Sequence, residues 1–126
     1  MKIQSIDHIV LTVTDLDKTI DFYTNILGFK VETFGDNRKV LTFGSQKINL
    51  HQKGNEFEPK AENPTSGSGD LCFISETNIK EVLEELKIKN IEIIEGIVER
   101  MGALGKIKSV YFRDPDLNLI EVSNYF

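Results

Sequence analysis

At 126 residues the chain is long enough for one ordinary hydrophobic core and too short for two conventional domains. It is 40% hydrophobic and 28% charged, as is typical of a globular protein. The net charge of -5, without a basic cluster, argues against nucleic acid as a partner. No apolar run approaches the roughly 20 residues of a membrane span, and no signal-peptide pattern opens the chain. With Cys72 as the single cysteine, we expect a cytoplasmic protein without a membrane partner.

The first half of the chain predicts one strand, one helix and three further strands. The helix begins after a polar Thr14-Asp15 pair, carries an apolar stripe at helical spacing, and ends before Gly28, where a left-handed stop residue is expected. Turns are predicted at Gly35-Asp36-Asn37 and at Gly44-Ser45. The predicted strands are 6–13, 29–34, 38–43 and 46–52, and the helix is 16–27.

The second half follows a segment rich in glycine, proline and polar residues (54–68), which we interpret as a linker. Asn78 with Glu81 resembles a capping box at the start of a second amphipathic helix. The segment Glu99–Gly105 is predicted as a glycine-flanked loop. Beyond the linker, the predicted elements are strand 70–75, helix 79–89, and strands 91–95, 107–113 and 118–123.

The two halves repeat one another. Aligning His8 with Asp70 also places Gly28 on Asn90, twenty residues further on in each half. The last strands can be aligned in two ways, with either Asn49 or His51 on Glu121. Strand alternation puts Asn49 and His51 on one face in both cases. A duplicated module is therefore predicted, with its equivalent residues related by a pseudo-twofold axis.

Four polar residues stand inside apolar strand-like runs, where a bare imidazole or carboxylate is costly to bury. They are His8, His51, Asp70 and Glu121. His8 and His51 are the only histidines of the chain, so any histidine ligand of a metal must be one of them. Each residue also has a structural interpretation, as a hydrogen-bonded rim residue, a surface residue or a turn boundary.

The motifs resemble the vicinal oxygen chelate superfamily, which includes glyoxalase I, bleomycin-resistance proteins and extradiol dioxygenases. The similarity lies in segments 7–16, 21–28, 69–74 and 111–122, and is nearest to glyoxalase-domain-containing proteins of unassigned substrate. It implies an α+β fold, in which two tandem βαβββ modules (about 4–53 and 69–126) form a curled mixed sheet around an open cavity in a single domain. It also implies a homodimer.

The resemblance implies one divalent metal, with ligands on the first and last strands of each module. His8 and Glu121 fall on ligand positions, Asp70 replaces a more usual histidine, and the remaining position holds Asn49 or His51. We favour His51 as the stronger donor. Two imidazoles and two carboxylates suit Zn, Ni, Fe, Mn or Co without selecting among them.

Such a metal would chelate adjacent oxygens of a small-molecule substrate and act as a Lewis acid. Glu121 or Asp70 is the expected general base, and Asn49 and Arg100 are weaker candidates for substrate contacts. These roles predict a glyoxalase-like lyase or isomerase acting on a small oxygenated metabolite. Two alternatives stay open: an Fe(II) ring-cleaving dioxygenase, and a metal-free protein that sequesters a ligand.

Overall fold

The computed structural model describes all residues, 1–126, and divides the chain into two compact units. We call residues 1–66 module 1 and residues 67–126 module 2, and describe each by itself. The boundary falls inside the segment predicted as a linker. Module 1 contains β1 (His8–Val13), α1 (Leu16–Asn25), β2 (Lys30–Phe34), β3 (Arg38–Phe43) and β4 (Gln46–Gln52). Module 2 contains β5 (Asp70–Ile74), α2 (Ile79–Ile88), β6 (Glu95–Met101), β7 (Lys106–Arg113) and β8 (Leu119–Tyr125).

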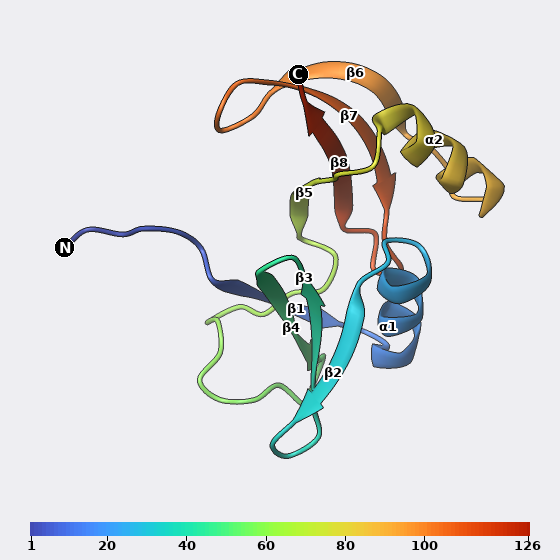
Figure 1. Cartoon of the computed structure of the whole chain (residues 1–126). Coiled ribbons are helices and arrows are strands. Elements are labelled where there is room, and N and C mark those ends of the chain that lie inside the picture. Colours follow the sequence, from blue (N-terminus) through green and yellow to red (C-terminus); the bar gives the residue numbers. More distant parts are fainter. The chain divides into compact units, whose positions relative to one another are not determined.

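Each module forms one four-stranded mixed sheet with one helix (Figure 1). The strand order is β1-β4-β3-β2 in module 1 and β5-β8-β7-β6 in module 2, so the topology is the same. In both, the first and last strands pair in parallel and the other neighbours pair antiparallel. The α+β class and the repeated βαβββ unit are thereby confirmed.

Polar caps begin both helices, as the sequence predicts. Asp15 accepts the backbone N–H of Lys18 at 3.1 Å, and Asn78 accepts that of Lys80 at 2.9 Å. Just beyond the helices, Gly28 (φ 71°) and Asn90 (φ 59°) both adopt the left-handed conformation. These two residues are equivalent in the internal repeat, so the helices of the two modules are followed by the same backbone device.

The core of each module lies between the helix and one face of the sheet. In module 1, Tyr23 of α1 is fully buried with Leu41 and Ile48 from the strands. In module 2, the buried strand side chains Phe112 and Ile120 accompany Leu86 of α2. Burial of one such apolar side chain contributes about 1.5–3 kcal/mol. Because side chains alternate along a strand, the residues between these core positions stand on the opposite face of each sheet.

One predicted strand is misplaced. The alternating residues 91–95 suggest a strand, but β6 begins at Glu95 and continues to Met101, so only 102–105 remain as a turn. A bulge lies between Gly96 and Val98, and Gly96 has φ 149°. A Cβ at Gly96 would lie 2.7 Å from Cγ1 of Val110, so the close approach to β7 requires glycine.

Neither helix has the length and apolar character needed to cross a membrane.

Candidate functional site

Glu121 stands on β8, on the face of the module 2 sheet that turns away from the core. One of its oxygens, Oε2, accepts hydrogen bonds from the hydroxyls of Ser109 at 2.5 Å and Ser123 at 3.3 Å. The two serine oxygens lie 2.7 Å apart, and both residues are fully buried. Hydrogen bonds to an ionised acceptor are shorter and stronger than neutral ones. The sheet therefore holds this carboxylate by one oxygen.

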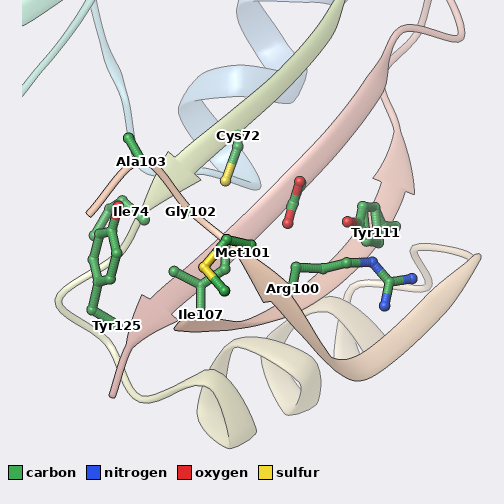
Figure 2. A pocket seen from close by; sticks show the side chains of 10 residues that line it. Cys72, Ile74, Arg100, Met101, Gly102, Ala103, Ile107, Tyr111 and Tyr125 are labelled. Carbon is green, nitrogen blue, oxygen red and sulfur yellow. The ribbon is translucent and has the colours of Figure 1, made fainter. Parts of the chain in front are cut away.

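A pocket of about 470 Å³ opens on this face (Figure 2). Its volume lies within the range of small-molecule sites. Apolar side chains form most of its wall, and Glu121, Arg100 and Tyr111 supply its main polar groups. The lining residues are Cys72, Ile74, Arg100, Met101, Gly102, Ala103, Ile107, Tyr111, Glu121 and Tyr125.

Arg100 and Tyr111 lie together on one side of the pocket (Figure 2). The guanidinium carbon of Arg100 is 5.5 Å from the centre of the Tyr111 ring, and Nη2 is 3.2 Å from Oε2 of Glu95. Burial and the neighbouring Glu121 carboxylate raise the pKa of Tyr111, although Arg100 opposes the shift. The Tyr111 hydroxyl is therefore protonated at neutral pH, and a hydrogen bond to Glu121 contributes to the shift.

Cys72 lies on β5 directly opposite Glu121 in the register. Its Sγ is 3.3 Å from the hydroxyl oxygen of Ser123. Burial raises the pKa of the Cys72 thiol, and the nearby Glu121 charge adds to the shift. A nucleophilic cysteine needs the opposite environment. Cys72, which is exposed, thus contributes a neutral thiol to the pocket wall.

Asp70 begins β5, where it is exposed. It pairs with Leu119, whereas Cys72 pairs with Glu121, so Asp70 and Glu121 are two positions apart on one face of neighbouring parallel strands. Module 2 therefore brings these two predicted site residues onto the same surface. Asp70 is not among the residues that line the pocket.

A turn with the buried side chains of Asp114 and Asn118 fixes where β5 and β8 begin. The side-chain oxygen of Asn118 accepts the N–H of Gly69 at 2.6 Å, and the N–H of Leu119 donates to the Gly69 carbonyl at 2.9 Å. Asp114 in turn holds Asn118, accepting its backbone N–H at 2.9 Å and its side-chain amide at 2.8 Å. This turn sets the register of the two strands that carry Asp70 and Glu121.

In module 1, His8 and His51 are not brought together. His8 is opposite Lys47, whereas His51 is opposite Thr12, so they lie four positions apart along neighbouring strands. At about 3.3 Å per residue, that is about 13 Å along the strands. His8 is exposed, and its Nδ1 is 2.7 Å from Oδ2 of Asp7. That hydrogen bond from His8 lowers the pKa of Asp7.

His51 is 8% exposed and packs against the linker segment. Its ring meets Phe57 edge-on, with the centroids 5.6 Å apart, and the guanidinium carbon of Arg38 stands 4.2 Å from the Phe57 centroid. Burial lowers the pKa of His51, so its neutral form is favoured in the folded protein. These contacts describe a buried histidine beneath an aromatic cover.

The register also decides the alignment that the sequence left open. Asn49 pairs with Val10, and Glu121 pairs with Cys72, each two positions after the pair that contains His8 or Asp70. Asn49, rather than His51, is therefore the module 1 equivalent of Glu121. His51 was favoured for the position equivalent to Glu121, and this choice is corrected. The parallel pairing of β1 with β4 makes His51 the equivalent of Ser123. The Asn49 Oδ1 atom is buried without a hydrogen-bond partner.

No three His, Cys, Asp or Glu side chains gather within either module as a potential metal-binding group. The donor chemistry of module 2 nevertheless fits a hard divalent cation. Asp70 and Glu121 offer two carboxylates on one face, and Mg²⁺-like ions are commonly bound by one or two carboxylates plus water and substrate. Ser109 and Ser123 hold only Oε2 of Glu121, which leaves Oε1 outside the serine contacts.

Residues 5–122 match the sequence pattern of the Glyoxalase/Bleomycin resistance protein/Dioxygenase superfamily. The chain is 59% identical over 125 residues to Virulence protein STM3117 of Salmonella typhimurium, a match that covers 99% of this chain and 87% of the relative. The crystal structure of that protein has a TM-score of 0.99, with all of both chains covered.

Two further relatives extend the comparison. Glyoxalase domain-containing protein RDO1 of Mycosarcoma maydis is 56% identical over 99% of this chain and 70% of its own length. Metallothiol transferase FosB of Staphylococcus epidermidis is 33% identical over 97% of this chain and 82% of its own length. The resemblance stated from the sequence motifs is thereby confirmed.

The serine pair and Tyr111 are polar features of the site that the sequence motifs did not single out. One signal was available, because Ser123 follows Glu121 by two residues and so shares its face of the strand. The partner positions Ser109 and Tyr111 follow only from the antiparallel register of β7 and β8.

Proposed function

The chain belongs to the Glyoxalase/Bleomycin resistance protein/Dioxygenase superfamily, and from this premise we propose that it is a metal-dependent enzyme of the lyase or isomerase type. Its proposed substrate is a small oxygenated metabolite bound in the module 2 pocket. The observation that carries the proposal is Glu121, a carboxylate at a largely apolar pocket with one oxygen held by buried hydroxyls. A relative named as a metallothiol transferase supports the use of a metal.

When bound, a divalent metal supplies Lewis-acid polarisation of the substrate oxygens. Asp70 and Glu121 are the module 2 residues proposed to hold it. Asp70 or Glu121 also serves as the proposed general base, because a carboxylate within reach of a carbon-bound proton can accept it. Tyr111 stays protonated, and its hydrogen bond to the Glu121 carboxylate helps to hold that carboxylate in place.

Arg100 gives the pocket a binding point for an anionic group of the substrate. Its guanidinium is partly exposed and is shared with Glu95 at 3.2 Å, so it stands at the pocket wall with its charge only partly compensated. On the other side, Ile74, Ile107 and Tyr125 offer apolar surface to a ligand (Figure 2). This combination favours a compact substrate with an anionic end and an apolar end.

The dioxygenase alternative calls for two histidines and one carboxylate around Fe(II). His8 and His51 lie at opposite ends of their strand pair, which counts against an arrangement that uses both. Asn49 in module 1 remains a weaker candidate for a substrate contact. Its side-chain amide oxygen is buried without a hydrogen-bond partner.

Proton abstraction can be tested by incubating the Mn²⁺-loaded protein with α-hydroxy ketones and α-hydroxy aldehydes in deuterium oxide. We expect deuterium to enter the carbon next to the carbonyl of at least one compound, with Mn²⁺ required. Glu121→Gln should abolish this exchange, whereas Glu84→Gln, on the exposed side of α2, should leave it unchanged. Oxygen consumption that requires Fe(II), without any exchange, would establish the dioxygenase alternative instead.

A further inference from the structure

We propose that Ser109 and Ser123 are positioning residues that fix Oε2 of Glu121 to the sheet and thereby turn Oε1 toward the pocket. This inference rests on the proposed role of Glu121. It states that the two serines determine the orientation of the Glu121 carboxylate.

The geometry forms a closed triangle of oxygens. The Ser109 hydroxyl reaches Oε2 at 2.5 Å, the Ser123 hydroxyl reaches the same atom at 3.3 Å, and the serine oxygens are 2.7 Å apart. Ser109 and Ser123 are directly paired across β7 and β8. Both are completely buried, so water does not compete for their hydroxyls. The shortest contact assigns Ser109 as the principal donor.

The arrangement restrains a side chain that would otherwise be free to rotate. A glutamate on an open sheet face has three rotatable bonds, and fixing one carboxylate oxygen removes most of that freedom. The serine pair holds Oε2 against the strands, and Tyr111 and Cys72 also interact with the carboxylate by hydrogen bonds. We infer that the serine contacts decide which of the two oxygens faces a ligand. Groups behind a metal ligand commonly orient it in this way, and their loss typically costs about 10–100-fold in metal affinity or activity.

Module 1 provides an internal comparison. The position equivalent to Glu121 is Asn49, and the position equivalent to Ser123 is His51. No hydroxyl meets the Asn49 side chain, whose Oδ1 is buried without a partner. The serine pair is therefore a property of the module that carries the carboxylate, and is not a general feature of the repeated sheet.

The test measures Mn²⁺ affinity by electron paramagnetic resonance, on the metal alone and without substrate. We expect Ser109→Ala to weaken binding about 10-fold or more and Ser123→Ala to weaken it less. Thr19→Val is the matched control, because it removes a buried hydroxyl without a partner in module 1 and should leave the affinity within about twofold. Full Mn²⁺ affinity in folded Ser109→Ala would overturn the inference.

A second measurement separates this inference from the proposed function. Crystal structures of the metal-free wild type and the Ser109→Ala and Ser123→Ala variants should show the Glu121 carboxylate rotated or disordered once the hydroxyls are absent. An unchanged carboxylate would overturn the inference. If the wild type binds no Mn²⁺, the proposed metal role fails, while the carboxylate orientation still decides the role of the serine pair. Should Ser109→Ala not fold, Ser123→Ala decides by the same criteria.

Discussion

Replacing Asp114 by alanine should destabilise module 2, because this side chain supports the turn that sets the register of the site strands. Asp114 is 3% exposed and Asn118 is 1% exposed. Oδ1 of Asp114 accepts the backbone N–H groups of Asp116 and Asn118, both at 2.9 Å, and Oδ2 accepts the Asn118 side-chain amide at 2.8 Å. Alanine removes both acceptor oxygens, and with them all three hydrogen bonds.

The size of the effect follows from the fate of each donor. A hydrogen bond to a charged group contributes about 1.5–3 kcal/mol, and a buried donor left without a partner costs about 1–3 kcal/mol. The Asp116 amide is part-buried and can turn to water, whereas both donors of Asn118 are buried. Since the three bonds share one carboxylate and do not add, we expect a loss of about 3–5 kcal/mol.

Urea denaturation followed by circular dichroism measures this loss in the free energy of unfolding. Asp36→Ala is the control, because it removes an exposed aspartate from the turn between β2 and β3 and should change stability by about 0.5 kcal/mol or less. A loss below about 1 kcal/mol for Asp114→Ala would refute the reasoning that the turn depends on this carboxylate.

Three further predictions concern the site and its surroundings. Cys72→Ala should retain the exchange activity, and the Cys72 thiol should react slowly with iodoacetamide at pH 7, because burial raises its pKa. Arg100→Gln should raise the KM for anionic substrates more than it lowers kcat, as steady-state kinetics would show. For His51, the folded-state pKa lies below the ordinary value, so the unfolded chain binds more protons and the contribution of His51 to stability is lost as pH falls below about 6.5. Urea melts at pH 5 and pH 8 should show a smaller pH difference in His51→Gln.

Local signals in the sequence predicted most of the fold. Asp15 and Asn78 mark helix starts because their side chains satisfy backbone donors, and Gly28 and Asn90 mark the ends because they tolerate a left-handed backbone. The strand predicted at 91–95 was misplaced, and the loop predicted at Glu99–Gly105 overlaps the strand that forms at Glu95–Met101. Gly96 allows a bulge of this strand against β7, which no local pattern indicates.

The site was less predictable because it depends on register. Asn49 and His51 share a face of β4, and only the parallel pairing with β1 shows which of them is equivalent to Glu121. Ser109 lies on a different strand from Glu121, so its contact with the carboxylate follows from cross-strand pairing and from no local pattern.

The proposed role of Glu121 is tested most directly by Mn²⁺ titration of the untagged, metal-free protein against its Glu121→Gln variant. We expect one Mn²⁺ per chain in the wild type and an affinity at least about 10-fold lower in Glu121→Gln, with Glu84→Gln unchanged. Equal Mn²⁺ binding by wild type and Glu121→Gln, or no uptake by the wild type at micromolar excess, would contradict the proposal.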